Sequence, residues 1–409
     1  MKRCSTTQPG CQVVALRTIA KIDRISVQPQ HIEAGTLYVG LEHIDGDGHF
    51  NNVKPVTKGE LASSKFRFTP SHILFGKLRP YLRKTARPDF GGICSTDILP
   101  ILPCPAIDRN YLFHYLRQSK IVDLATSRSS GANLPRLSPT LLAEFPISLP
   151  PYEEQKRIAQ ILDKADALRD LRTEGLQRLE QLLCATFAKA FGDPIANPYA
   201  WERVSFDEIL EAIESGWSPV CLDRPAGSDE WGVLKLGAIT QCVFVESENK
   251  ALPETQMPRS ILEVAAGDLL FSRKNTKDLV AACALVETTR DKLMMPDLIF
   301  RLRLKDEARC LPEYLWALLT NDSKRKQVQQ LAAGTSGSMP NISKDKLRRL
   351  LIELPPLEKQ LEFRTHFRTI RRLQKRMLSS LRAAEAFSDS IQSKLFSGEL
   401  SQRELEIHV

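Results

Sequence analysis

The stretch LPPYEEQKRIAQILDKADALRDL, from Leu149 to Leu171, returns near the end of the chain as LPPLEKQLEFRTHFRTIRRLQKR, from Leu354 to Arg376. In both copies Leu-Pro-Pro precedes an acidic residue and then a glutamine, and no proline follows for more than forty residues. Proline fits the first turn of a helix, and acidic side chains there interact favourably with the helix dipole. The stretch therefore predicts the start of a long helix, and its return predicts a second one.

The similarity between the two copies extends beyond these helices. Upstream, SSGANLPRLS (from Ser129) resembles TSGSMPNIS (from Thr335), and HILFGKLRP resembles DLLFSRKNT. Downstream, LLCATFAKAFGDP resembles SIQSKLFSGEL. The spacing of about 190–205 residues is far longer than that of a solenoid repeat, so it indicates two domain-sized copies.

The sequence pattern of each copy changes at Leu-Pro-Pro, from that of strands and loops to that of a long helix. Before it, short apolar runs such as ILFGKL and DLIFRLRL are separated by Gly, Pro and Ser, which is typical of strands and loops with a few helices. We therefore predict two copies of a mixed α/β (α+β) domain, related by a pseudo-twofold internal repeat and joined by two long antiparallel coiled-coil helices. The predicted boundaries are globular domains at 1–149 and 194–353, spacer helices at 150–193 and 354–400, and a tail at 401–409.

Apolar residues recur at a seven-residue spacing in both proline-free segments, which is typical of a coiled coil. Neither helix has a partner within its own copy, so the simplest arrangement packs the two seams on each other. Arg169 and Arg172 interrupt the first seam, and we expect Gln374 or acidic residues of the facing helix to receive them. The predicted seam residues are Ile158, Leu162, Leu176, Leu179, Leu183, Phe363, Phe367, Ile370, Met377, Leu381, Ile391 and Leu395.

The charge of the chain favours a polyanionic partner. It carries 57 Lys and Arg against 49 Asp and Glu, and residues 1–150 alone hold 19 basic against 11 acidic residues. The nine cysteines include no Cys-x-x-Cys pair, so they favour free thiols over a zinc site. No run of 18 apolar residues and no apolar signal region is present, and we expect a cytoplasmic protein without a membrane anchor.

Basic side chains gather at matching places in the two copies, in FGKLRPYLRKTAR (Phe75–Arg87) with SSKFRFTP just upstream, and in FSRKNTKD (Phe271–Asp278). Such groups neutralise phosphates, and Arg, Lys and Asn pair with base edges. The loops SSGANLPR and GTSGSMPN either approach DNA or join globular part and helix, and a solvated loop is the alternative for each cluster. The predicted DNA-binding residues are Lys65, Arg67, Lys77, Arg79, Arg83, Lys84, Arg87, Asn133, Arg136, Arg273, Lys274, Asn275, Lys277 and Asn341.

Motifs of DNA-modifying and DNA-cleaving enzymes are missing from the sequence. NPYAW at Asn197 lacks the second proline of an adenine-methyltransferase loop, and ENK at Glu248 lacks the Pro-Asp of a metal-dependent nuclease. The sequence contains no Gly-x-x-x-x-Gly-Lys-Ser/Thr and no His-x-x-x-His. We therefore predict a non-catalytic chain without a metal site.

The segments GANLPRLSPTLLAEFPISLPPYEEQKRIAQILDKAD, FGDPIANPYAW, LPPLEKQ and LFSGEL resemble, in this order, the specificity subunits of type I restriction–modification systems. The resemblance covers essentially the whole chain. It implies that each globular domain is a target-recognition domain that reads one half of a split, asymmetric DNA site, and that the helices set the spacing. It also implies partners: two methyltransferase subunits and, on that core, restriction (motor–nuclease) subunits.

The same resemblance implies that the chain itself binds no cofactor. S-adenosylmethionine, ATP and Mg are expected on the partner subunits of this restriction endonuclease and DNA adenine methyltransferase. The alternative from another class is a coiled-coil assembly adaptor whose basic heads bind protein or RNA. A self-sufficient methyltransferase is disfavoured by the missing motifs.

Overall fold

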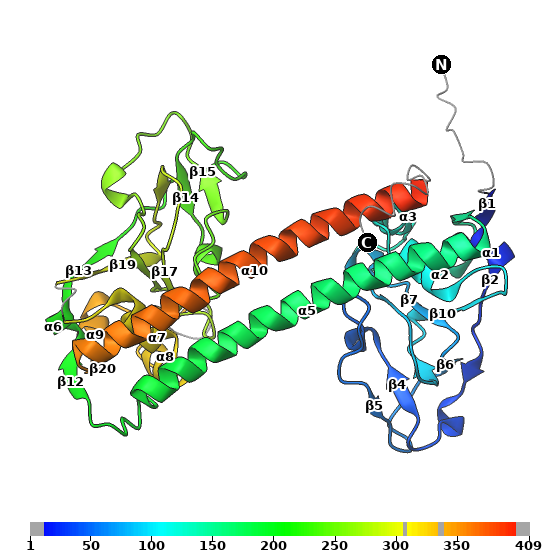
Figure 1. Cartoon of the computed structure of the whole chain (residues 1–409), viewed down its shortest axis with the longest axis horizontal. Coiled ribbons are helices and arrows are strands. Elements are labelled where there is room, and N and C mark those ends of the chain that lie inside the picture. The colour runs from blue at the N-terminus through cyan, green and yellow to red at the C-terminus, as the bar shows by residue number, and fades with distance from the viewer. Residues whose placement is uncertain (1–11, 306–308, 334–338, 398–409) are drawn as a thin grey trace. The chain divides into compact units, whose positions relative to one another are not determined.

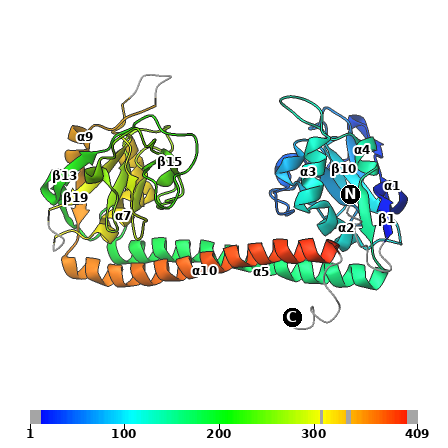
Figure 2. The same cartoon turned by 90° about the horizontal axis from the view of Figure 1, so that it is seen from above.

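The computed structural model describes residues 12–305, 309–333 and 339–397, so the predicted tail at 401–409 lies outside the described residues. The chain divides into two compact units, which we call unit 1 (1–173 and 379–409) and unit 2 (174–378). Helices α5 (Tyr152–Phe191) and α10 (Leu357–Ser397) each contribute one part to either unit (Figures 1 and 2). Two α/β bodies and two long helices are what the repeat predicted, and this fold class is confirmed.

Unit 1 contains an antiparallel sheet of order β2-β10-β7-β8, a mixed sheet of order β3-β6-β9-β4-β5 and the ribbon β1-β11. Its strands are β1 (Gln12–Ala15), β2 (Ala20–Ile22), β3 (Ser26–Val27), β4 (Leu37–Val39), β5 (Lys54–Pro55), β6 (Lys65–Phe68), β7 (Ile73–Gly76), β8 (Thr85–Ala86), β9 (Gly92–Cys94), β10 (Ile98–Pro103) and β11 (Pro146–Leu149). Its shorter helices are α1 (Leu16–Ile19), α2 (Arg109–Leu116), α3 (Ser119–Ser127), α4 (Pro139–Ala143) and the 3-10 turns η1 (Pro29–His31), η2 (Leu41–His43) and η3 (Pro80–Leu82).

Unit 2 repeats this plan with the sheets β13-β19-β16-β17 and β15-β14-β18 and the ribbon β12-β20. Its strands are β12 (Glu202–Ser205), β13 (Leu210–Ser215), β14 (Gly232–Leu234), β15 (Asn249–Ala251), β16 (Leu269–Ser272), β17 (Cys283–Leu285), β18 (Leu293–Met294), β19 (Ile299–Leu304) and β20 (Leu351–Leu354). Its shorter helices are α6 (Phe206–Ile209), α7 (Pro312–Thr320), α8 (Asp322–Gln329), α9 (Lys344–Arg348) and the 3-10 turns η4 (Leu236–Ala238) and η5 (Ser260–Leu262).

One central strand in each unit has core on both of its faces. In β7, Ile73 and Phe75 face the core built on α2, whereas Leu74 belongs to a second core under the mixed sheet. Strand β16 follows the same alternation, with Leu269 and Phe271 on one side and Leu270 on the other. Successive side chains of a strand point to opposite faces, so burial on both explains the unbroken apolar runs ILF and LLF. Both strands end where the predicted basic clusters begin.

Leu-Pro-Pro marks the step from a strand to a long helix in both units. The preceding residues form β11 and β20, which pair antiparallel with β1 and β12, and α5 and α10 begin within two residues of the second proline. Proline has no N–H for a strand ladder, while its fixed φ suits a helical first turn. The two prolines therefore end the strand and start the helix at one point.

The repeated glutamine fastens each long helix to its globular part. Gln155 and Gln360 are 1% and 0% exposed. The Gln155 carboxamide accepts from the Asp108 N–H at 2.8 Å and donates to the carbonyl oxygens of Ala106 and Pro150. Gln360 makes the same three hydrogen bonds, to Leu311 N–H and to the carbonyl oxygens of Arg309 and Pro355. All donors and acceptors of the two buried amides are thereby used, apart from one lone pair on each amide oxygen.

The two long helices run antiparallel within each unit. In unit 2, the Gln374 amide donates to Glu180 at 2.9 Å, and the rings of Phe191 and Phe363 pack 5.4 Å apart. In unit 1, Ile158 and Leu162 of α5 share a core with Leu395 and Phe396 of α10. All twelve predicted seam residues are buried or half-buried, whereas their neighbours Leu168, Leu171 and Phe387 are exposed.

In the part of the chain that the structure describes, no helix combines the length and apolar character needed to cross a membrane. The same residues bring no three His, Cys, Asp or Glu side chains together in a way that would hold a metal ion.

Candidate functional site

Each unit places its predicted basic cluster against its predicted polar loop. In unit 1, the segment after β7, residues 77–84, is basic loop 1, and Leu78 forms a β-bridge with Arg136 of the 129–136 loop. In unit 2, basic loop 2 (residues 273–282) follows β16, and Lys274 forms the equivalent bridge with Asn341. Backbone hydrogen bonds reinforce both, from Leu137 N–H to Lys77 O and from Ile342 N–H to Arg273 O. Two segments far apart in sequence therefore form one polar surface at the same place in each unit.

In unit 1, four predicted residues lie together on this surface. The Arg79 guanidinium donates to the carbonyl oxygen of Asn133 at 3.4 Å, and the Arg79 N–H donates to Pro135 O at 2.8 Å. Lys77 lies 3.9 Å from the carboxylate of Asp97, which also holds Arg136. Asn133 and Arg136 are exposed, whereas Lys77 and Arg79 are half-buried. Arg79 also has a left-handed backbone (φ +50°), which turns the chain sharply at the tip of basic loop 1.

In unit 2, the predicted residues divide between surface and interior. Lys277 is exposed and Lys274 is half-buried, while the Arg273 guanidinium lies 5.4 Å from the centre of the Phe300 ring. Asn275 is buried, and its side-chain oxygen accepts from the Thr276 N–H at 2.8 Å, so it shapes the turn. Asn341 is half-buried beside Lys274. Residues 334–338 of the predicted GTSGSMPN loop lie outside the described residues.

Three predicted DNA-binding residues instead point toward the interior of unit 1. Arg83 donates to the carbonyl oxygen of Arg117 at 2.9 Å, and Lys84 donates to that of Leu41 at 2.6 Å. Arg87 forms an ion pair with Asp163 of α5 at 2.8 Å and lies over the Phe113 ring at 4.2 Å. These contacts tie basic loop 1 and the segment after it to the body of unit 1, and the basic cluster of the sequence therefore has two halves with different surroundings.

The two residues predicted just upstream also separate. Lys65 is 5% exposed, its ammonium donates to Ser63 O and Oγ at 2.8 and 2.7 Å, and burial lowers its pKa. Arg67, two positions further along β6, is exposed. The alternation of the strand places both on one side, but only Lys65 is buried.

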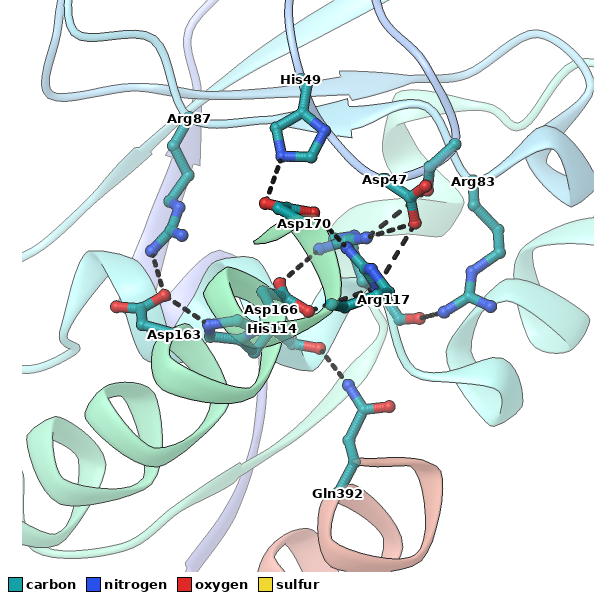
Figure 3. Close-up of polar contacts among 12 residues, drawn as sticks. Asp47, His49, Arg83, Arg87, His114, Arg117, Asp163, Asp166, Asp170 and Gln392 are labelled. Atoms are coloured by element: carbon teal, nitrogen blue, oxygen red, sulfur yellow. Dashed lines mark hydrogen bonds and ion pairs between the residues drawn. The ribbon is translucent and has the colours of Figure 1, made fainter. Parts of the chain in front are cut away.

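A polar network joins the body of unit 1 to the first half of α5 (Figure 3). His114 Nε2 lies 2.8 Å from Asp163 and Arg117 lies 3.2 Å from Asp166, while His49 contacts Asp170 at 3.1 Å. An ionised carboxylate only accepts, so His114 must carry its proton on Nε2. Gln392 of α10 adds a hydrogen bond to the carbonyl oxygen of His114.

The prediction that Arg169 contacts Gln374 or an acidic residue of the facing helix is wrong. Its guanidinium lies 3.4 Å from Asp47, in the loop after η2, and 3.3 Å from Asp166 of its own helix, and not against the facing helix. Gln374 instead contacts Glu180 and Arg371. A long arginine side chain at a seam position can leave the seam and reach a globular part that the helical pattern does not contain.

The joint of unit 2 has the opposite distribution of charge. There the body supplies the acids, with Glu313 at 2.7 Å from Arg368 and Glu287 at 2.6 Å from Arg371 of α10. Arg368 occupies the position that corresponds to Asp163 in α5, 205 residues earlier. In unit 1 the body cations Arg87, His114 and Arg117 instead contact Asp163 and Asp166 of the helix, so these pairs have the reverse polarity, and only the Arg169–Asp47 pair named above keeps the polarity of unit 2.

Acid is expected to weaken unit 1 through His114. Burial lowers the pKa of His114 below its ordinary value of 6.5, although Asp163 acts in the opposite direction. The unfolded chain therefore binds a proton near pH 6.5 that the folded chain does not bind, and stability falls as the pH drops below about 6.5, by at most about 1.4 kcal/mol per pH unit. Thermal unfolding of the full chain between pH 7.5 and 5.5 tests this.

The His114→Gln variant is the matched change, because its amide keeps a donor toward Asp163 but does not titrate. Its melting temperature should vary less with pH than that of the parent chain. His31, which is exposed, provides the control, and His31→Gln should keep the full pH dependence. Equal slopes in the parent and His114→Gln chains would contradict this assignment.

Asp97 and Gln155 are among the residues that were not predicted. Asp97 was missed because an acidic residue is not expected within a DNA-binding cluster, although its repeat in STDILPIL and MPDLIFRL was visible. The role of Gln155 was also missed, although the repeated motif contained it together with Gln360. In both cases, repetition at the same place in the two copies was the available signal.

Comparison with known proteins places the chain beside one group. The family model for the type I restriction modification DNA specificity domain matches residues 51–181. The specificity subunit of the type I restriction enzyme EcoEI of Escherichia coli is 34% identical over 206 residues, which is 48% of this chain and 34% of that protein. The EcoKI specificity subunit of Escherichia coli strain K12 is 24% identical over 76% of this chain and 69% of that protein.

The chain thus spans about a third of the length of the first relative and about two thirds of the second. Among solved structures, the S subunit of a type I restriction–modification system from M. genitalium has the same fold, with a TM-score of 0.59 at 10% sequence identity. That match covers 97% of this chain and 98% of the other.

Proposed function

The chain belongs to the DNA specificity subunits of type I restriction–modification systems, and from this premise we propose that it selects the DNA sequence on which a multisubunit complex acts. It contributes no catalytic residues of its own. Unit 1 reads one half of a split site and unit 2 reads the other. The observation that carries this proposal is the repeated construction of the polar surface, a basic loop bridged to a second loop at the end of a central strand in each unit.

The two kinds of side chain on these surfaces serve different purposes. Lysines such as Lys77 and Lys277 neutralise phosphates and add affinity without reading sequence. Arg136 and Asn341 carry planar groups that form paired hydrogen bonds with guanine and adenine respectively. Each loop is held by backbone hydrogen bonds, so the side chains reach DNA from a fixed platform and little order has to be imposed on binding.

The chemistry of the complex comes from partner subunits. Two methyltransferase subunits with S-adenosylmethionine dock on the long helices, and restriction subunits with ATP and Mg join them. Exposed apolar residues away from the seam, among them Leu168, Leu171 and Leu182 of α5, support a protein partner on these helices. The complex acts on double-stranded DNA in the cytoplasm.

DNA binding by the assembled complex should weaken steeply with salt. Six to ten phosphate contacts lose about 10³–10⁵ in affinity between 50 and 200 mM salt. The double variant Lys77→Glu/Arg79→Glu should lose recognition of the first half-site, and Arg273→Glu/Lys274→Glu that of the second. Fluorescence anisotropy with duplexes that carry one or both half-sites measures each loss.

Two further variants control this experiment. Arg24→Glu, an exposed change outside both basic loops, should bind as the parent does. Arg83→Glu should lower the melting temperature of the chain, because it breaks the bond to Arg117 O inside unit 1. A salt response that stays flat, or equal losses from all four variants, would contradict the proposal.

The alternative of an adaptor whose basic heads bind protein or RNA makes a different prediction. Such an adaptor would not discriminate between duplex DNA molecules of equal length and different sequence. Competition by unrelated duplex DNA therefore separates the two functions, since a specificity subunit keeps its target in an excess of competitor.

A further inference from the structure

An acidic side chain lies in the middle of the polar surface of unit 1. Asp97, just before β10, accepts from Arg136 Nε at 3.0 Å and from Arg136 Nη2 at 3.4 Å, one bond to each carboxylate oxygen. Lys77 lies 3.9 Å from the same carboxylate, and the Lys77 N–H donates to the Asp97 carbonyl oxygen at 2.9 Å. A carboxylate here repels phosphates, so a surface built only for charge would not contain it.

The bonds to Arg136 leave a defined part of its guanidinium free. The group has five N–H donors in a planar fork. Asp97 takes two of them, and Leu134 O takes one from Nη1 at 3.4 Å. The remaining two are one N–H on each Nη atom, and we call these two the outer donors. Since the Arg136 side chain is 44% exposed, these donors are open to a ligand.

The backbone of Arg136 is fixed as well. Its N–H donates to Ser130 O at 2.8 Å, its carbonyl oxygen accepts from Ser130 N–H at 3.1 Å, and the next residue, Leu137, donates to Lys77 O. Gly131, with φ +110°, makes the tight turn that closes this loop. Backbone and side-chain bonds thus hold the guanidinium in one orientation before any ligand binds. The exposed Asp97–Arg136 ion pair adds little to the stability of the fold, but it orients the guanidinium.

We propose that Asp97 is a positioning residue that presents the outer donors of Arg136 to the O6 and N7 atoms of a guanine in the first half-site. Two parallel donors at the end of an arginine fork match these two acceptors in the major groove. The inference rests on the proposed function. It assigns to unit 1 the recognition of one G·C base pair, and it assigns to an acidic residue a part in reading DNA.

The equivalent described residues of unit 2 make different contacts. Asp297, which holds the place of Asp97 in the repeat, forms a hydrogen bond with the hydroxyl of Ser218. Asn341 holds the place of Arg136. A change at Asp97 should therefore alter the first half-site at a single base pair and leave the second half-site as it was.

The test replaces Asp97 in the full chain, assembled with its methyltransferase subunits. A DNA library randomised at each position of the first half-site is methylated by the parent complex and by the Asp97→Asn, Asp97→Ala and Arg136→Lys variants, and the products are sequenced. Arg136→Lys keeps the charge but loses the fork. Asp123→Ala, which removes an exposed acid on α3, is matched to Asp97→Ala in charge.

We expect all three variants to lose about tenfold in preference for guanine at one shared position, within the roughly 5–150-fold that a bidentate pair provides. The two Asp97 variants should bind total DNA as well as the parent or better, because an acid is gone. If Asp97 acted only by repelling phosphates, its removal would raise the affinity for DNA and leave the preference for guanine unchanged. Asp123→Ala should keep the parental preference.

Two results would overturn the inference. One is an unchanged base preference in both Asp97 variants. The other is a uniform loss of affinity across all sequences in Arg136→Lys, which would make Arg136 a phosphate contact. If the parent complex itself showed no sequence preference, the proposed function would fail and not the role of Asp97 alone. Melting temperatures of all variants identify any chain that fails to fold.

Discussion

A fragment of residues 1–195 is expected to form a twofold dimer that, with the methyltransferase subunits, methylates an inverted repeat of the first half-site. The fragment contains the whole of α5, but the core of unit 1 also needs Leu395 and Phe396 of α10, which it lacks. A second copy supplies substitutes. Phe191 lies 205 positions before Phe396, and it already packs on Tyr314 in unit 2 as Phe396 packs on Tyr111 in unit 1.

The helix seam also favours this dimer. Gln374 contacts Glu180 in the native chain, and its counterpart 205 positions earlier is Arg169. In the dimer, Arg169 of one copy therefore comes near Glu180 of the other, which is an attractive pair. Two identical units related by a twofold axis read two identical half-sites in opposite directions, so the DNA target must become palindromic.

Sequencing of methylated adenines in DNA from cells that co-express the fragment and the methyltransferase subunit checks this result. A control fragment with Leu179→Asp puts a charge in the seam, and it should stay monomeric in sedimentation and inactive. Methylation at the original asymmetric site by the fragment would contradict the two-copy interpretation, because it would make unit 2 dispensable.

The second large effect is expected from lengthening both long helices by one heptad. Seven residues inserted after Thr173 in α5 and seven after Leu378 in α10 add about 10 Å to each helix. This length corresponds to about three base pairs at 3.4 Å each. A heptad preserves the seam, so the recognised half-sites should remain the same while the unread gap between them grows by about three base pairs.

Insertion of the heptad into α5 alone is the control for this experiment. This single insertion shifts the seam residues of α5 on one side of it by seven positions relative to the α10 residues that they face. Methylation should therefore be abolished at both the original and the lengthened site. Mapping of methylated sequences again gives the answer. Altered half-sites with an unchanged gap would show that these helices do not set the spacing.

The sequence by itself determined those features that depend on periodicity and repetition. The seven-residue spacing of apolar residues predicted a seam on each long helix, because a helix brings such residues to one side whatever surrounds it. It did not include Phe187 and Phe191, which pack on Phe363 of the facing helix. The two Leu-Pro-Pro steps located the starts of both long helices, since the effect of proline on backbone conformation is local. The recurrence of basic residues in FGKLRP and FSRKNT likewise pointed to a related surface in the two units.

The tertiary structure alone decided which polar side chains lie on the surface and which bond inside the units. Arg79 and Arg83 are four positions apart in one basic segment, yet one lies on the surface with Asn133 and the other bonds to Arg117 O inside the unit. The exposure and partners of a charged group depend on which distant segments cover it, and no local pattern records them. The same holds for Asp97, because the role that we propose for it depends on Arg136. This residue is 39 positions away in the sequence, and folding brings its Nε within 3.0 Å of the Asp97 carboxylate.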